Sequence, residues 1–224
     1  MSRRLNSIGK RSRVKNYRGD TVDCFLISKF RLAQDSKRNI QHTNGLELLY
    51  KGLRDFYFEA EPEKFLIAKT DSGKPFFFDK PEYNFNISHS GEHCAVMISD
   101  KMCGADIEEI RAFPKKVLKK ICTEKETEYI FSLPEDKQEK AMWTLWTLKE
   151  SYVKAIGKGL SFGMKNVFFD KFPFENNTEK KKISWGDTAF FDKDNMTCIE
   201  NKFGTFYLYS DDEVCVSFCR SSGT

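Results

Sequence analysis

Residues 143–160 read WTLWTLKESYVKAIGKGL, and this stretch has the spacing of a long helix that ends at Gly157. An apolar row at helical spacing predicts the face that packs against the core, and it consists of Ala141, Leu145, Leu148, Tyr152 and Ile156. Trp146, Glu150 and Lys154 form a second row, four residues apart, beside the apolar one. This second row is either a surface ion pair, which stabilises a helix by ~0.3–0.5 kcal/mol, or one wall of an active site.

Helices and short strands lie on both sides of this stretch. Capping-box sequences at 123–126 and 132–135 predict two helix starts, the second with Pro134 in the first turn of the long helix. A further helix is predicted over residues 44–59. A turn is predicted at 89–92, and strands at 22–28, 76–78, 84–87, 94–99, 102–108, 167–169, 182–185, 198–200, 205–209 and 214–218.

This element order predicts an α+β fold made of two similar halves. In this pseudo-dimer each half has one long helix packed on a small antiparallel sheet. The expected halves are residues 1–103 and 104–224, with the active site between them. Residues 1–20 are rich in arginine and lysine, and we expect a flexible basic tail because no aromatic stacking pattern accompanies these charges.

The composition narrows the class of protein. The 224 residues carry a net charge of +4 and contain no apolar run that approaches a membrane span. The residues after Met1 do not resemble a secretory signal. The seven cysteines include no CxxC pair, so we expect reduced thiols and no zinc site. We therefore expect a cytoplasmic protein without membrane or nucleic-acid partners.

Two acidic residues stand out in the predicted strand 102–108. Asp106 and Glu108 are two residues apart, so their side chains project from the same face. Adjacent carboxylates repel each other unless a proton or a cation lies between them, and Mg²⁺ takes oxygen ligands of this kind. Glu150 would add a third carboxylate, and Lys154 a donor to phosphate oxygen. The alternative is a strand end whose charges face water.

Residues 86–91 read NISHSG, a stretch that offers hydroxyls, an imidazole and backbone N–H groups to an anion. A nucleophilic Ser88 activated by His89 is less well supported, because neighbouring residues rarely reach that geometry and the GxSxG elbow is absent. The alternative is a polar hairpin turn. Lys74, in SGKP at 72–75, adds a cation one strand upstream, although a lone lysine in a turn is usually solvated.

Together, the motifs GKP, FNISHSG, GADIE and WTLKESYVKAIGKGL occur in an order and spacing that resemble the 4′-phosphopantetheinyl transferase superfamily, in its longer, surfactin-synthetase-activating (Sfp-type) branch. The resemblance covers residues 74–160. It implies a Mg²⁺-dependent enzyme that transfers the phosphopantetheine arm of coenzyme A to a serine of an apo acyl or peptidyl carrier protein. It also implies that adenosine 3′,5′-bisphosphate is released, and that one chain, similar to two fused copies of the short type, is a monomer.

The resemblance also implies roles for particular residues. The metal ligands would be Asp106, Glu108 and Glu150. The catalytic residues would be Glu150 and Lys154, with Glu150 or a water taking the proton of the carrier serine and Lys154 assisting the leaving group. The residues that bind coenzyme A would be Lys74, Ser88, His89 and Lys154.

The 3′-phosphate of coenzyme A has unassigned candidates in Arg31, Lys37, Arg38 and His42. Basic residues in 111–116 and 158–162 are expected to face an acidic carrier protein, with Phe113, Leu160 and Phe162 either contacting it or belonging to the core. The alternative functions are a non-catalytic binder of carrier proteins or coenzyme A with the same fold, and another metal-dependent phosphoryl-transfer enzyme such as a nuclease.

Overall fold

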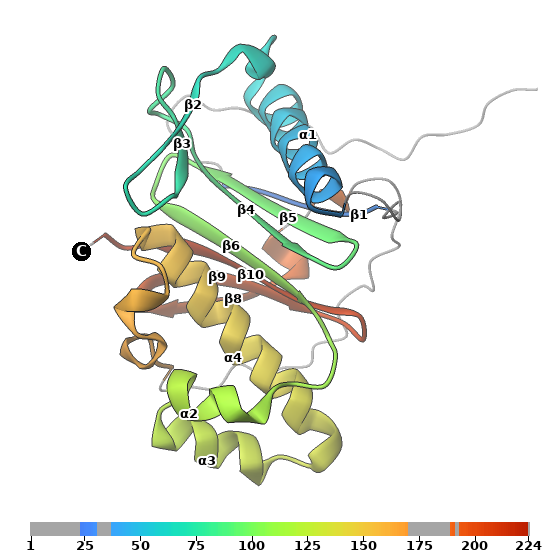
Figure 1. Cartoon of the computed structure of the whole chain (residues 1–224), viewed down its shortest axis with the longest axis vertical. Helices are drawn as coiled ribbons and strands as arrows, with labels where there is room; N and C mark the ends of the chain where they lie inside the picture. The colour runs from blue at the N-terminus through green and yellow to red at the C-terminus, as the bar shows by residue number, and fades with distance from the viewer. Residues whose placement is uncertain (1–22, 31–36, 170–188, 191–192, 224) are drawn as a thin grey trace, which may run out of the picture.

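The computed structural model describes residues 23–30, 37–169, 189–190 and 193–223. Two four-stranded antiparallel sheets lie next to each other, and one long helix packs on each of them (Figure 1). The α+β fold predicted from the sequence is therefore confirmed. The division into two similar halves stays a prediction, and one strand that follows residue 104, β7, belongs to the first sheet.

The first sheet has the strand order β4-β5-β1-β7. Its elements are β1 (Cys24–Lys29), α1 (Lys37–Tyr57), β4 (Asn84–Ser90), β5 (His93–Ser99) and β7 (Ala189–Phe190). Side chains alternate along β1, as expected of a strand with two covered faces. Leu26 packs with Leu49 of α1, whereas Phe25 and Ile27 belong to the core between the two sheets.

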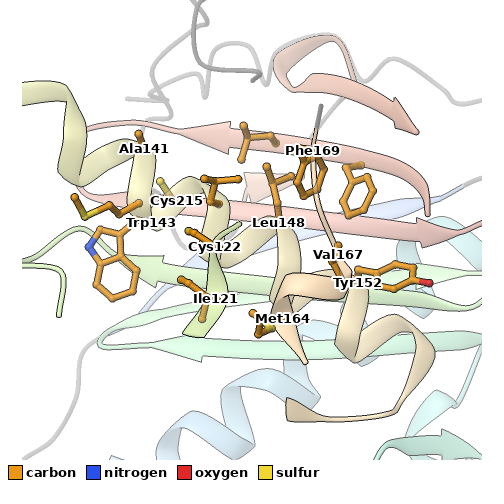
Figure 2. Packing of buried hydrophobic residues seen from close by; sticks show 14 of the residues in the cluster. Ile121, Cys122, Ala141, Trp143, Leu148, Tyr152, Met164, Val167, Phe169 and Cys215 are labelled. Carbon is orange, nitrogen blue, oxygen red and sulfur yellow. The ribbon is translucent and has the colours of Figure 1, made fainter. Parts of the chain in front are cut away.

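The second sheet has the strand order β6-β10-β9-β8. Its elements are β6 (Cys103–Glu109), α4 (Glu135–Ile156), β8 (Thr197–Asn201), β9 (Gly204–Ser210) and β10 (Val214–Ser221). Leu145 and Leu148 of the predicted core row are fully buried between α4 and this sheet. Figure 2 shows part of that cluster, with side chains of α4 near Met164, Val167 and Phe169. Burial of this apolar face is what holds α4 on β6 and β10.

Shorter elements complete the described fold. They are η1 (Pro62–Lys64), β2 (Ile67–Lys69), β3 (Pro75–Phe77), η2 (Lys115–Val117), α2 (Leu118–Ile121), α3 (Glu124–Ser132), η3 (Leu160–Phe162), η4 (Met164–Asn166) and η5 (Lys193–Asn195). The capping box at the start of α3 is confirmed, because Thr123 Oγ1 accepts the Glu126 N–H and Glu126 Oε2 accepts the Thr123 N–H. Gly157 ends α4 in the left-handed conformation, with φ of 69°, as predicted.

Side chains of β4 connect the two sheets at their neighbouring edges. Asn86 Oδ1, Ser88 Oγ and Ser90 Oγ accept backbone N–H groups of β6 at 2.9, 3.3 and 3.1 Å. The donors are Ala105, Ile107 and Glu109. Because residues two apart on a strand share a face, this polar row of β4 runs along β6 and fixes the carboxylates of β6 against β4.

Two sequence predictions near the site are wrong. The turn expected at 89–92 contains only Gly91 and Glu92, since β4 continues to Ser90 and pairs it with His93. Gly91 has φ of 53°, which a tight hairpin turn requires and glycine adopts without strain. The capping box expected at 132–135 does not form. Pro134 is the N-cap residue of α4 and Ser132 donates instead to the carbonyl of Tyr129 within α3.

Four further predictions differ from the structure or fall outside it. Residues 167–169 pack into the core without forming a strand. The first helix begins at Lys37, seven residues before the predicted start at 44. The predicted strand at 182–185 and the basic tail at 1–20 lie outside the described residues. In the described part of the chain, no helix combines the length and the apolarity needed to cross a membrane.

Candidate active site

Strands β4 and β6 and helix α4 bring Ser88, Asp106 and Lys154 together. The ammonium of Lys154 lies 2.5 Å from Asp106 Oδ1 and 3.0 Å from Ser88 Oγ. Ser88 in turn donates to Asp106 Oδ1 at 3.1 Å. Asp106 is only 3% exposed, and burial raises the pKa of its carboxyl although Lys154 and Ser88 oppose this effect. The predicted row on α4 therefore faces the predicted acidic pair on β6.

Glu108 and Glu150 complete an acidic group around Lys154. Glu108 projects from the same face of β6 as Asp106 and accepts a hydrogen bond from Ser90 Oγ at 2.8 Å. Burial raises the pKa of Glu108, and the charge of Asp106 raises it further. Burial likewise raises the pKa of Glu150 to about 7, and the charges of Asp106 and Glu108 contribute in the same direction. The charge of Asp106 therefore acts on both glutamates, and the charge of Glu108 acts on Glu150.

Lys154 is the cation that this acidic group holds. Its burial alone would lower the pKa of the ammonium, but Asp106, Glu150 and Glu108 outweigh that effect and the net pKa is raised. The side chain keeps 31% of its surface exposed, and its raised pKa keeps the ammonium charged at neutral pH. Lys154 therefore brings a positive charge to the partly exposed edge of the acidic group.

The residues fit a hard divalent cation, although their side chains do not form a ready-made site. Among the described residues, no three side chains of the types Asp, Glu, His and Cys are gathered closely enough to hold a metal ion. However, Asp106 Oδ2 is buried and has no hydrogen-bond partner within the described part of the chain. Three neighbouring carboxylates, of which Asp106 raises the pKa of the other two, with one oxygen unpaired, are a donor set that Mg²⁺ suits.

Lys74 has a different position from the other predicted residues. Its ammonium donates to the carbonyls of Cys103, at 3.0 Å, and Ala155, at 2.5 Å. Burial lowers the pKa of this ammonium. Lys74 thus connects the start of β6 to the end of α4, and it lines a cavity of about 230 Å³ with Thr70, Ser72, Phe76, Met102 and Gly157 among its other lining residues.

His89 lies on β4 next to α1, and burial lowers the pKa of its imidazole, with Lys154 contributing in the same direction. Its Nε2 is buried and has no hydrogen-bond partner among the described residues. The absence of a side chain at Gly45 lets His89 pack directly against α1, because a Cβ at position 45 would lie 2.7 Å from His89 Nε2. His42 is exposed, and the side chains of Arg31, Lys37 and Arg38 lie outside the described part of the chain.

Sequence reasoning missed several residues that support this site. The pattern N-x-S-x-S at 86–90 was available as a signal for a polar row, but the predicted turn at 89–92 obscured it. Gly104 begins the GADIE motif, but nothing in the sequence indicates that a Cβ there would lie 1.9 Å from the Ser151 carbonyl oxygen. Lys149 has no recognisable signal either, because its partner Glu126 lies 23 residues away in the sequence.

The expected contact residue Phe113 is part of the core. It is 7% exposed and packs edge-on against Trp143, with ring centroids 4.7 Å apart. Of the two interpretations of this phenylalanine, the structure therefore supports the core. Lys115 and Lys116, in contrast, are exposed on η2. The loop that leads to them begins at Arg111, whose carbonyl accepts a hydrogen bond from Trp143 Nε1 of α4 at 2.7 Å.

Three carboxylates and a lysine gather between β6 and α4, and comparison with known proteins places the chain in a family. Residues 102–219, just over half of the chain, match the model of the 4′-phosphopantetheinyl transferase superfamily. The chain belongs to this superfamily, in its Sfp-type branch.

Individual relatives agree with this assignment. A 4′-phosphopantetheinyl transferase (psf-1) of Bacillus pumilus is 31% identical over 139 residues, which cover 62% of this chain and 58% of the relative. The corresponding transferase (gsp) of Aneurinibacillus migulanus is 39% identical over 110 residues, covering 49% and 45%. An L-aminoadipate-semialdehyde dehydrogenase-phosphopantetheinyl transferase of Xenopus laevis is 32% identical over 186 residues, covering 76% and 59%. The alignments thus span about half the length of these relatives.

The stability of the metal-free protein is expected to fall as the pH rises, because of Glu150. The folded-state pKa of about 7 is above the ordinary 4.5, so the stability gained from the protonated carboxyl is complete below pH 4.5 and is lost as the pH rises through 7. The full effect is about 3 kcal/mol. Urea unfolding at pH 5 and pH 8 measures it, and Glu150→Gln should flatten the difference. An equal pH dependence in both proteins would contradict the assignment to Glu150.

Proposed function

We propose that this chain transfers the 4′-phosphopantetheine group of coenzyme A to a serine of an apo carrier protein, with Mg²⁺ as cofactor. The observation that carries the proposal is the position of Lys154, within hydrogen-bond distance of Asp106 and Ser88 and in the field of Glu108 and Glu150. The relatives that are named phosphopantetheinyl transferases support the same reaction.

The reaction needs one bond to form and one to break at phosphorus. The serine Oγ of the carrier would bond to the phosphorus that bears the pantetheine arm. The bond from this phosphorus to the bridging oxygen would break, and adenosine 3′,5′-bisphosphate would leave with the electron pair. Such a transfer depends mainly on positioning and charge neutralisation, which the groups at this site are suited to provide.

Each residue of the site has a role in this mechanism. Mg²⁺, when bound by Asp106, Glu108 and Glu150, would neutralise charge that develops on the pyrophosphate. Lys154 would leave Asp106 and donate to the leaving oxygen. Glu150, or a water, would take the proton of the serine.

Binding of coenzyme A would use β4 and the loop that contains Lys74. Ser88 and His89 are neighbours on β4, the strand at the edge of the site. The Nε2 of His89 is buried and has no partner among the described residues. Burial and Lys154 lower the pKa of the imidazole, and a phosphate oxygen beside Nε2 would raise it again, so that a protonated Nε2 would donate to the phosphate. Lys74 would contact the nucleotide end from the neighbouring cavity.

The partner, location and oligomeric state are part of the proposal. An acidic carrier protein would approach over the exposed Lys115 and Lys116. The site takes its residues from both sheets of one chain, so a monomer can supply a complete set. Six of the seven cysteines are buried and all seven are free thiols, which is consistent with a reducing compartment such as the cytoplasm.

A mass-shift assay tests the proposed function. The protein is incubated with coenzyme A, Mg²⁺ and a panel of apo acyl and peptidyl carrier proteins, and each carrier is then weighed by mass spectrometry. The expected result is a gain of one phosphopantetheine on at least one carrier, which is absent when Mg²⁺ is chelated and absent when the target serine is alanine. Binding of coenzyme A and carriers without any mass gain would favour the non-catalytic binder instead.

A further inference from the structure

Next to Glu150 in the sequence, Lys149 places a charged group in the protein interior. Its side chain is fully buried, and its ammonium donates to Glu126 Oε2 at 2.7 Å, to the Ile121 carbonyl at 2.8 Å and to the Met164 carbonyl at 3.4 Å. Glu126, at 1% exposed, is equally buried. Neither residue belongs to the group of carboxylates around Lys154, so the mechanism described above leaves this ion pair without a role.

Glu126 also connects further segments to the pair. Its Oε2 accepts the Thr123 N–H at 2.7 Å in the capping box, and its Oε1 accepts the Phe169 N–H at 3.3 Å. Helix α4 is therefore tied through one side chain, Lys149, to the end of α2, the start of α3, the η4 turn and the segment that follows it. This is a fully hydrogen-bonded network, the kind that specifies one arrangement of a core.

The direction of Lys149 determines the direction of Glu150. Successive residues of an α-helix are separated by about 100° around its axis, so a helix whose Lys149 is fixed towards α2 and α3 turns Glu150 to a fixed face. On the opposite side, Ser151 hydrogen-bonds Ser217 of β10 at 3.0 Å. Glu150 thus lies between two anchored neighbours, and its face is the one that meets Asp106 and Glu108.

The stability that such a pair provides does not explain its presence. A buried ion pair recovers in Coulomb attraction little more than its two charges lose in leaving water, and well-packed apolar residues often replace it without loss. A charged pair with several directed hydrogen bonds fixes the geometry of the helix, because each bond restrains the distance from the helix to its partner and the orientation of the helix.

We propose that the Lys149–Glu126 pair is a positioning device, which sets the rotation of α4 so that the Glu150 carboxylate faces the acidic pair of β6. The inference rests on the proposed function for its kinetic consequence, but its structural consequence is independent of it. Lys149 and Glu126 would act through Glu150 and would not touch the substrate, coenzyme A or the reacting atoms.

The test replaces the charged pair with a neutral one of similar size, Lys149→Met with Glu126→Gln, which avoids leaving one charge buried alone. Mg²⁺ binding is measured by calorimetry on the protein without substrates, and kcat and KM are measured in the carrier assay. We expect the Mg²⁺ dissociation constant to rise, and kcat to fall, by about 10- to 100-fold, as for residues that orient metal ligands. The KM for the carrier should stay within about twofold of the wild-type value if only Glu150 is displaced.

Thr147→Ala is the matched control, because it removes an equally buried hydroxyl from the same helix whose hydrogen bond, to the Thr144 carbonyl, stays within α4. It should lower the unfolding midpoint but keep the wild-type Mg²⁺ dissociation constant. Glu126→Asp is a second test that retains both charges. By shortening the carboxylate it draws Lys149 towards α3, so it should weaken Mg²⁺ binding to a smaller extent, and it decides the question if the double variant fails to fold.

Wild-type Mg²⁺ affinity in the folded double variant, or in Glu126→Asp, would overturn the positioning role. Failure of the proposed function gives a different result, in which the wild-type protein modifies no carrier. The calorimetric comparison would still decide the role of Lys149 in that case, because it needs no substrate.

Discussion

Asp106→Asn is expected to reduce the rate of phosphopantetheine transfer by about 10²–10³-fold, the loss typical of removing one preorganised electrostatic group. The substitution removes the charge but keeps an oxygen that can accept from Lys154 and Ser88, as Oδ1 does now at 2.5 and 3.1 Å. The unpaired Oδ2, which we assign to the metal, becomes an amide nitrogen that cannot bind a cation. The measurement is kcat for a carrier at saturating coenzyme A over a range of Mg²⁺ concentrations.

The fold should tolerate this change. The charge of Asp106 raises the pKa of Glu108 and of Glu150, so removing it relieves repulsion and offsets the weaker attraction to Lys154. Asp23→Asn is the matched control, because Asp23 is also a buried aspartate and pairs with Ser99 and Arg220 away from the site. It should cost stability and leave transfer intact. Wild-type turnover in Asp106→Asn would refute the role given to its carboxylate.

Gly104→Ala is expected to cost about 3 kcal/mol or more of unfolding free energy, at the upper end of what overpacking a core produces. A Cβ at this position would lie 1.9 Å from the Ser151 carbonyl oxygen and 2.5 Å from the Ala155 nitrogen. Both atoms belong to the backbone of α4, so no side chain can move aside and the helix itself must shift away from β6. Urea unfolding monitored by tryptophan fluorescence measures the loss.

Gly52→Ala provides the comparison for this prediction. The nearest atoms to a Cβ there are the δ-methyl groups of Ile98 and Leu26, at 2.8 Å, and these are the far ends of side chains that can adjust. Gly52 also lies within α1, where alanine is the better helix former by about 1 kcal/mol. We expect Gly52→Ala to be much less destabilising than Gly104→Ala. Equal losses at both positions would show that the distance to the α4 backbone is not the cause.

Activity should fall with Gly104→Ala even under conditions where the variant stays folded. Gly104 lies two residues before Asp106 on β6, and Ser151 follows Glu150 on α4. Any movement that separates these backbones separates the carboxylates that we assign to one metal ion. Because positional errors of about 1 Å cost on the order of 100-fold in rate, the loss in turnover should exceed the loss expected from the unfolded fraction alone.

The local features of the site could be read from the sequence. The period of α4 identified its buried row, and the two-residue spacing on β6 placed Asp106 and Glu108 on one face. The capping box at Thr123 and the end of α4 at Gly157 were also predicted, since each depends on residues only a few positions apart. These features are decided by backbone geometry within one element, so the sequence of that element is sufficient.

Contacts between elements required the tertiary structure. Asn86, Ser88 and Ser90 accept N–H groups of β6 because the edges of the two sheets meet there. The Lys149–Glu126 pair and the contact of Gly104 with α4 likewise join segments 23 and 47 or more residues apart. Even Lys74, a recognisable cation in the sequence, has its ammonium on two carbonyls that only folding brings near it.

Burial explains why features within one element were predictable and contacts between elements were not. The amino-acid sequence alone indicates which groups carry charge and which face of each helix or strand they occupy. It did not determine how far each charge is removed from water or which other charges share its surroundings. The pKa of about 7 for Glu150 arises from burial first and from the charges of Asp106 and Glu108 on another element second, and both come into being only when α4 packs against β6.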